Sequence, residues 1–215
     1  MVKPSDKDIK EVYDNIAEGF YNMRQRNPHP AGPYIRELSK EWKPGLLLDV
    51  GCGIGTWMIP FIKNGFECIG IDISPKMIEF GKKFAKTHKT KLKLKTANML
   101  ELPFDDEKFD YVISVAAIHH LDNNKKRLKA LSEMKRVLKR DGKIFIAVWN
   151  KEQKRFSGAG KDVYVPWKHE GKEYNRYHHL FSKDELKNIV EKSGIKIEKI
   201  FEDVTGKNIC LICKK

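Results

Sequence analysis

Cysteine is scarce in this sequence, and long apolar runs are missing. The four cysteines among 215 residues, Cys52, Cys68, Cys210 and Cys213, have spacings that indicate no disulfide framework. Cys210 and Cys213 stand three positions apart in an expected strand, so their side chains should point to opposite faces, and we expect no metal site. No apolar stretch approaches the roughly 18 residues of a membrane span. Residues 1–6 also lack the basic-then-apolar order of a signal peptide, so we expect a cytoplasmic protein without membrane contacts.

Acidic residues are too few to balance the basic ones. The chain has 42 lysines and arginines against 29 aspartates and glutamates, which gives a net charge of +13 at pH 7. Such an excess favours a polyanionic partner such as RNA, because each neutralised phosphate releases counterions. Solvent-facing lysines on a helix, such as Lys82, Lys83 and Lys86, are also common on proteins without such a partner. The charge alone therefore leaves both interpretations open.

Short apolar runs alternate with helical patterns through most of the chain. Expected strands occupy 46–50, 68–71, 92–96, 109–115 and 144–149, and expected helices occupy 57–63, 75–87, 125–138 and 183–193. This alternation requires crossover connections and predicts a doubly wound α/β fold with a mostly parallel sheet. Two further strands, 196–201 and 208–213, follow without an intervening helix. They should pair as a hairpin, so that the last strand of a seven-stranded sheet is antiparallel. Two N-terminal helices, 5–23 and 34–42, precede the first strand.

We expect a single domain, 1–215, with four parts. An N-terminal helical segment (1–44) precedes a cofactor-binding core (45–149), and a C-terminal helix and hairpin (183–215) ends the chain. The remaining segment, 150–182, shows little periodicity but contains many aromatic and basic residues. It follows the fifth strand, and ligands bind at the carboxyl ends of the strands in such sheets. We therefore expect 150–182 to be a substrate loop.

A glycine-rich loop follows the first strand and opens a helix. Its spacing, with Gly51, Gly53 and Gly55 in alternate positions, differs from that of dinucleotide-binding loops, whose third glycine comes one residue later. Asp49 precedes the first glycine and would repel a pyrophosphate, but it can attract an ammonium group through water. Asp72 ends the second strand, near the offset at which a carboxylate binds ribose hydroxyls. The loop thus indicates a nucleoside ligand with a cationic amino-acid end.

Further candidates stand at the ends of the neighbouring strands. Met77 could pack on adenine, Asn98 and Met99 follow the third strand where an adenine-edge contact is expected, and residues 114–117 should line the amino-acid side. Core packing is the alternative for both methionines. The predicted cofactor-binding residues are Asp49, Gly51, Cys52, Gly53, Gly55, Asp72, Ile73, Met77, Asn98, Met99, Ser114, Val115 and Ala116.

Over 46–149 the chain resembles class I S-adenosylmethionine methyltransferases, on the motif 49–55, Asp72, Asn98 and the pair at 109–110. A narrower resemblance covers most of the chain and rests on 12–17, 114–121, 127–131, 148–149, 162–167 and 176–181. These segments look like the tRNA wobble-uridine carboxymethyl methyltransferases. The resemblance implies S-adenosylmethionine as cofactor and the carboxylate of 5-carboxymethyluridine at tRNA position 34 as methyl acceptor.

The resemblance also implies a partner and has two departures. The partner is a small zinc-binding activator protein, whose expected docking surface around the third strand includes Leu92 and Leu94. Asn98 stands where the family has an acidic residue, although its amide oxygen can still accept a hydrogen bond from the adenine amine. Residues 26–30 follow the family's aromatic and proline-rich stretch only loosely.

The expected chemistry is in-line methyl transfer to an ionised carboxylate, which needs no general base. Arg24, Arg155 and Arg176 are the candidates for holding that carboxylate, and Lys161 and Arg26 are candidates for holding phosphate. Tyr177 and Trp167 should either stack on an everted base or form a hydrophobic lid. In each pair of adjacent histidines, 119–120 and 178–179, one should pack and the other face the cleft. The predicted catalytic set is Arg24, Arg155, Arg176, Tyr177 and His178.

Two other functions remain open at this stage. A small-molecule O- or C-methyltransferase of lipid or quinone type would share the whole pattern up to residue 149. A non-catalytic protein that binds S-adenosylmethionine or RNA would share it as well. RNA binding should weaken steeply with salt, whereas binding of a neutral small substrate should not.

Overall fold

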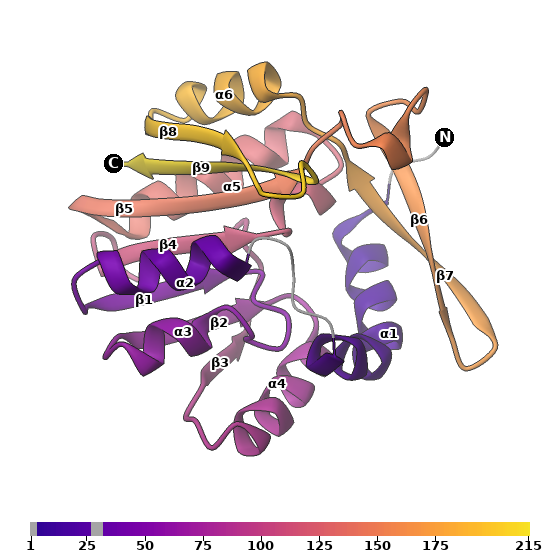
Figure 1. Ribbon diagram of the computed structural model, residues 1–215, viewed down its shortest axis with the longest axis horizontal. Coiled ribbons are helices and arrows are strands. Elements are labelled where there is room, and N and C mark those ends of the chain that lie inside the picture. Colours follow the sequence, from indigo (N-terminus) through magenta and orange to yellow (C-terminus); the bar gives the residue numbers. More distant parts are fainter. Residues whose placement is uncertain (1–3, 27–31) are drawn as a thin grey trace.

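The computed structural model describes residues 4–26 and 32–215 and contains a seven-stranded sheet with helices on both faces (Figure 1). The helices are α1 (Asp6–Arg26), α2 (Gly32–Glu41), α3 (Met58–Lys63), α4 (Pro75–Thr87), α5 (Asn124–Val137) and α6 (Lys183–Lys192), with short 3₁₀ turns η1 (Ile118–His120) and η2 (Lys154–Phe156). The strands are β1 (Leu46–Val50), β2 (Glu67–Asp72), β3 (Lys93–Thr96), β4 (Phe109–Val115), β5 (Leu138–Trp149), β6 (Asp162–His169), β7 (Lys172–His179), β8 (Lys196–Glu202) and β9 (Asn208–Lys214).

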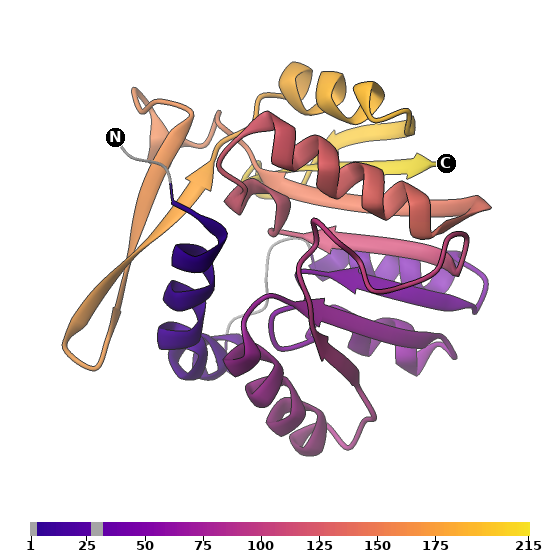
Figure 2. The ribbon, with the colours of Figure 1, turned by 180° about the vertical axis from the view of Figure 1, so that it is seen from behind.

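The strand order of the main sheet is β3-β2-β1-β4-β5-β9-β8. β9 runs antiparallel to both β5 and β8, and the other neighbours are parallel, as the sequence predicts. Helices α2 and α3 pack on one face of the sheet (Figure 1), and α5 and α6 cover the other (Figure 2). Cys210 lies in the core under α2 and α3 and Cys213 in the core under α5 and α6, so the two thiols do point to opposite faces.

Residues 150–182 do not form an irregular loop, which corrects the prediction for this segment. β6 and β7 pair along their whole length as an antiparallel hairpin that projects beside α1 (Figures 1 and 2). The sequence of this segment does not show the alternation of apolar and polar residues that predicts a strand, because both faces of the hairpin carry large side chains. Trp167 and Tyr174 pack on α1, whereas Tyr177 is buried on the other side of its strand. The last residues of β7, 177–179, are buried on both faces, and such a stretch lacks the alternation of apolar and polar residues that marks a half-exposed strand.

β3 is an edge strand, as expected, but its leucines are not exposed. Leu92 and Leu94 are half-buried and contact the backbone at Gly55, Gly70 and Gly81, while the lysines at 91, 93 and 95 face outward. The edge at β3 thus consists of half-buried leucines and unpaired backbone flanked by lysine, and docking of a partner here stays a prediction.

Helix α1 crosses the carboxyl ends of the parallel strands. Three of its side chains make contacts with three different segments of the chain. Asp14 accepts hydrogen bonds from the Ser74 hydroxyl at 2.6 Å and the Lys76 backbone at 3.2 Å, Tyr13 bonds His120 at 2.7 Å, and Asp6 forms an ion pair with Lys126 at 3.0 Å. These contacts place α1 over the sheet edge where ligands bind in such folds. Within the described residues, no helix has the length and apolarity that crossing a membrane would require.

Candidate active site

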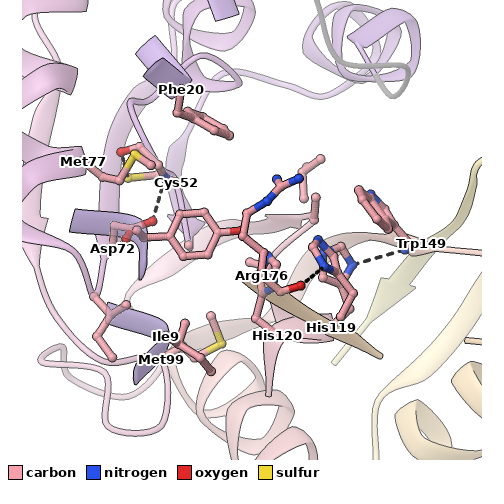
Figure 3. Close-up of a pocket in the computed structure, with 18 of the residues that line it drawn as sticks. Ile9, Phe20, Cys52, Asp72, Met77, Met99, His119, His120, Trp149 and Arg176 are labelled. Atoms are coloured by element: carbon pink, nitrogen blue, oxygen red, sulfur yellow. Dashed lines mark hydrogen bonds between the residues drawn. The ribbon is translucent and has the colours of Figure 1, made fainter. Parts of the chain in front are cut away.

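A cavity of about 590 Å³ lies between α1, the β6–β7 hairpin and the loops that follow β1, β2, β3 and β4 (Figure 3). Most of the predicted cofactor-binding residues line it. They are Gly51, Cys52, Gly53, Asp72, Ile73, Met77, Asn98, Met99, Val115 and Ala116. Four predicted catalytic residues, Arg24, Arg155, Arg176 and His178, line the same cavity.

The glycine-rich loop after β1 contains three left-handed residues, Gly51, Gly53 and Gly55. Gly51 has φ of +75°, and a Cβ at this position would come within 2.4 Å of the Ala117 side chain, so only glycine fits. The Gly53 N–H donates to Asp72 Oδ2 at 2.8 Å, and the Ser74 N–H donates to Asp72 Oδ1 at 2.9 Å. The loop and the end of β2 are thus tied together by one carboxylate.

Burial, with a smaller contribution from the negative charge of Asp14, raises the pKa of Asp72 to about 6 despite hydrogen bonds from Ser74 and Gly53 that lower it. At neutral pH this carboxylate is mostly ionised and still has lone pairs to offer. It can accept hydrogen bonds from two adjacent hydroxyl groups of a ligand.

Three predicted cofactor residues lie behind the cavity wall. Asp49 is fully buried, neither of its carboxylate oxygens has a hydrogen-bond partner among the described residues, and burial raises its pKa well above the ordinary value. Ser114 donates its hydroxyl to Val50 O at 3.1 Å. Gly55 is confined by packing, since a Cβ there would lie 2.8 Å from Leu92 Cδ1. These residues shape the loop from beneath.

Three guanidinium groups are held in the cavity without carboxylate partners. Arg24 lies over the Phe20 ring at 4.7 Å, Arg176 over the Trp167 ring at 4.8 Å, and Arg155 near the Trp149 and Phe156 rings. Of the residues that the structure describes, no acid forms a salt bridge with any of the three. Burial, together with the positive charge of Arg176, lowers the pKa of Arg24 to about 10. Guanidinium groups arranged in this way have the chemistry to bind an anion.

Tyr13 and His120 form a hydrogen-bonded pair beside Arg24 and Arg176. The Nδ1 atom of His120 lies 2.7 Å from the Tyr177 carbonyl oxygen, which only accepts, so Nδ1 carries the proton. Nε2 is then the acceptor for the Tyr13 hydroxyl at 2.7 Å. Burial lowers the pKa of His120 to about 4, so the imidazole is neutral at physiological pH.

His119, His120 and His178 cluster at the cavity wall, with one ring nitrogen of each within 4.8 Å of the others. One nitrogen of each of two rings makes a hydrogen bond outside the cluster: His119 Nδ1 accepts from the Trp149 N–H at 3.2 Å, and His178 Nδ1 donates to Arg176 O at 3.0 Å. His178 also stacks on Trp149, with ring centroids 4.0 Å apart. The three histidines form a packed, hydrogen-bonded part of the cavity wall. The absence of a metal site stays a prediction.

Several other predicted residues lie elsewhere. Tyr177 is buried outside the cavity and donates its hydroxyl to Asp162 Oδ1 at 2.5 Å, which removes it from the substrate-stacking candidates. Trp167 does line the cavity. Lys161 forms an ion pair with Glu185 at 3.0 Å, and its predicted phosphate contact stays a prediction. Arg26 is exposed at the end of α1, and residues 27–30 of the loosely matching stretch fall outside the described residues.

Within the histidine pairs the prediction holds for one and fails for the other. His178 lines the cavity, whereas His179 is buried between Asp162 and Glu185, at 2.7 and 3.0 Å. Both His119 and His120 line the cavity. They lie in the 3₁₀ turn η1, where adjacent side chains do not alternate between two faces as they do in a strand.

Several cavity residues were given no role in the site from the sequence. Asp6, Tyr13 and Phe20 come from α1, whose helical spacing predicts an apolar face but not what that face covers. Trp149 and Lys207 come from the end of β5 and the β8–β9 turn. Each acquires its position from contacts with distant segments; Tyr13 and His120, for example, are 107 positions apart.

Comparison with known proteins identifies the family to which the chain belongs. Residues 48–146 match a family model described as a methyltransferase domain. The tRNA (carboxymethyluridine(34)-5-O)-methyltransferase of Schizosaccharomyces pombe is 31% identical over an alignment of 212 positions. The alignment covers 86% of this chain and 87% of that protein. The chain belongs to the S-adenosylmethionine-dependent methyltransferase family.

Two further comparisons limit what can be concluded from similarity to known methyltransferases. The mouse "Probable tRNA methyltransferase 9B" is 31% identical over 77% of the chain, but the chain spans about a third (35%) of that protein's length. A putative methyltransferase from Haloferax volcanii, solved in complex with the Trm112 methyltransferase activator, has a TM-score of 0.74, 16% identity and 96% coverage of both chains. At 16% identity, the similarity to the Haloferax volcanii structure shows a shared fold only.

The cavity of the methyltransferase fits its cofactor, S-adenosylmethionine. At Gly51, which lines the cavity, there is no room for a side chain. Asp72 can accept hydrogen bonds from both ribose hydroxyls of the cofactor. Asp49 is a buried carboxylate without a hydrogen-bond partner among the described residues, lying beneath the loop, and a nearby ammonium group would favour its charged form. When bound, the cofactor supplies an electrophilic methyl group on a sulfonium.

Proposed function

We propose that the chain transfers the methyl group of S-adenosylmethionine to the carboxylate of 5-carboxymethyluridine at the wobble position, position 34, of tRNA. One observation carries the proposal: Arg24, Arg155 and Arg176 share a cavity with the glycine-rich loop and have no ion-pair partner in the described part of the chain. A neutral methyl acceptor would leave these charges uncompensated. A carboxylate compensates them through charge-assisted hydrogen bonds. The names of the Schizosaccharomyces pombe and mouse relatives support the choice of tRNA.

The arginines bind and orient the acceptor, and no residue has to remove a proton. A carboxyl group with a pKa of about 4 is already ionised at neutral pH. One O–CH₃ bond forms as one S–CH₃ bond breaks, and a carboxylate and a sulfonium become a neutral ester and a neutral thioether. His120, neutral because burial lowers its pKa to about 4, keeps Tyr13 in place beside the arginines. Catalysis then rests on alignment and on the exclusion of water.

A small zinc-binding activator is proposed as the partner of the chain. The Haloferax volcanii neighbour was solved with an activator of methyltransferases, and β3 of this chain offers unpaired backbone at the sheet edge. The lysines at 91, 93 and 95 flank that edge, so the complementary surface of the activator should be acidic.

The decisive experiment measures transfer of labelled methyl from S-adenosylmethionine to tRNA that carries 5-carboxymethyluridine, with and without the activator. Unmodified tRNA is the acceptor control. We expect alkali-labile label on the modified tRNA alone, because the product is an ester. Arg24→Ala and Arg176→Ala should each lower kcat/KM for that tRNA at least tenfold, since each removes a charge-assisted hydrogen bond.

Lys161→Ala is the matched control, because this lysine also lies on the 150–182 segment but pairs with Glu185. Absence of label in every condition, despite tight binding of S-adenosylmethionine, would reject the tRNA substrate. Turnover of a small organic acid would then favour the small-molecule reaction, and tRNA binding without release of S-adenosylhomocysteine would indicate a non-catalytic RNA-binding protein.

A further inference from the structure

A carboxylate from the N-terminal helix lies at the adenine end of the cofactor cavity. Asp6, the first residue of α1, lines the cavity together with Ile73, Asn98 and Met99. Ile9, close to one helical turn later, lies beside Met99 (Figure 3). Because the loop after β1 faces the amino-acid end and Asp72 after β2 faces the ribose, the base extends toward the residues that follow β3, the next strand. Asp6 is therefore positioned at the edge of the base.

The Asn98 side chain already makes two hydrogen bonds within the protein. Its Oδ1 atom already accepts from the Leu100 N–H at 3.0 Å, within its own turn. Its Nδ2 atom points to Asp6, 3.3 Å from Oδ2. The side chain thus presents a donor to the carboxylate. The adenine edge offers an exocyclic amine, which needs an acceptor.

Asp6 retains acceptor capacity after its protein contacts are counted. Oδ2 receives one hydrogen bond from Asn98, and Oδ1 receives one from the Lys126 ammonium at 3.0 Å. A carboxylate has about four acceptor positions, so about two remain. The side chain is partly exposed, at 29%, and lines the cavity. Lys126 and Asn98 fix its orientation, which lowers the entropic cost of a further bond.

We propose that Asp6 accepts a hydrogen bond from the exocyclic amine of the cofactor's adenine, with Asn98 and Lys126 as its positioning residues. The adenine-edge acceptor then comes from α1, which accounts for an amide at position 98. Helix α1 completes the cofactor site, and the site should discriminate between an amine and a carbonyl at the 6-position of the purine.

The experiment compares two ligands by calorimetry on the whole chain: S-adenosylhomocysteine and S-inosylhomocysteine, which has a carbonyl in place of the amine. The wild-type protein should prefer the amine by about tenfold to a hundredfold, the range for a hydrogen bond to a charged group. Asp6→Ala should weaken S-adenosylhomocysteine binding and reduce that preference to near unity. No methyl transfer is measured, so the result is independent of the proposed tRNA substrate.

Asp122→Asn is the matched control. Asp122 is the other carboxylate partner of Lys126, at 2.9 Å, and it does not line the cavity, so its removal should leave the preference intact. A purely structural role for Asp6 predicts that Asp6→Ala weakens both ligands equally; that result overturns the proposal. The proposal also fails if Asn98→Ala abolishes the preference while Asp6→Ala retains it.

Discussion

At the scale of single residues, Asp72 should make cofactor binding depend on pH. Its pKa is raised to about 6, chiefly by burial, and the ribose hydroxyls need the ionised form as acceptor. As the pH falls through about 6 the carboxyl takes up a proton, and binding the cofactor must then displace that proton. The affinity for S-adenosylhomocysteine should therefore be constant above pH about 7 and fall below pH about 6, by up to about tenfold per pH unit.

Calorimetric titrations of S-adenosylhomocysteine between pH 5 and 8 measure this dependence. Asp72→Asn should bind more weakly and lose the pH dependence over this range. A wild-type affinity that stays level down to pH 5 would contradict the assignment of the titrating carboxyl.

Asp49 should lower the stability of the protein without its ligand. It is fully buried without a hydrogen-bond partner among the described residues, and burial raises its pKa. A carboxyl whose pKa is raised on folding binds its proton more tightly in the folded chain. Stability is therefore lost as the pH rises from about 4, where the unfolded chain ionises, toward the folded pKa. Asp49→Asn removes this loss, so it should raise the melting temperature at pH 8 by about 2 °C or more.

The same variant should bind S-adenosylmethionine more weakly, because the amide cannot attract the ammonium group. Thermal melts with and without ligand separate the two effects. A melting temperature that falls in Asp49→Asn without ligand would show that the carboxyl has a stabilising partner when the protein is free of cofactor.

At the scale of elements, the glycine-rich loop contains glycines with different tasks. Gly53 has φ of +54°, lines the cavity, and a Cβ there would lie 3.6 Å from Phe20, in ordinary contact. Gly55 has φ of +82°, and its Cβ would lie 2.8 Å from Leu92 and 3.0 Å from Met58, outside the cavity lining. We expect Gly55→Ala to cost about 1–3 kcal/mol of folding free energy, through strain and overpacking.

Gly53→Ala should cost less stability but more cofactor affinity, since its methyl group occupies space on the ligand side. Denaturant titration and calorimetry on both variants test the contrast. Equal losses of stability in the two would refute the distinction drawn from the packing around each glycine.

Elements with a strong local signal were predictable, and those defined by distant contacts were not. The helix at 75–87 agrees with its prediction because Ser74 caps it, accepting the Met77 N–H at 3.0 Å, and Pro75 fixes its first turn. The strand at 109–115 agrees because it is buried on both faces. β5 begins at Leu138, earlier than the predicted 144, because its first residues pair with β4 around a bulge near Asp110 that periodicity does not reveal.

The candidate site divides in the same way. The glycine motif and Asp72 are recognisable because the loop's conformation requires those residue types in a fixed local order. The contributions of α1 are not, because a helix that is apolar on one face packs on many surfaces. Only the fold brings Tyr13 to His120 and Asp6 to Asn98.

At the scale of the whole molecule, charge is sorted along the cavity. Asp6 and Asp72 lie at the cofactor end, and Arg24, Arg155 and Arg176 lie toward the hairpin and the loop after β5. Lysines continue this basic side onto the surface around η2 and the β8–β9 turn. A tRNA bound there would meet cations as it delivers its carboxylate.

The net charge of +13 should therefore act on tRNA through this rim more than through the rest of the surface. A triple variant, Lys151→Ala, Lys154→Ala and Lys207→Ala, removes three lysines that form no salt bridge in the described chain and that flank or line the cavity mouth. It should lower kcat/KM for modified tRNA and reduce the slope of log(kcat/KM) against log[salt] by about 0.7 for each phosphate that is no longer neutralised.

The control removes the same charge from α4, by Lys82→Ala, Lys83→Ala and Lys86→Ala, and should change the slope little. A larger change in the α4 variant would place the RNA backbone on the α4 and β3 side. No salt dependence in the wild type would mean that the basic surface plays no part in substrate binding.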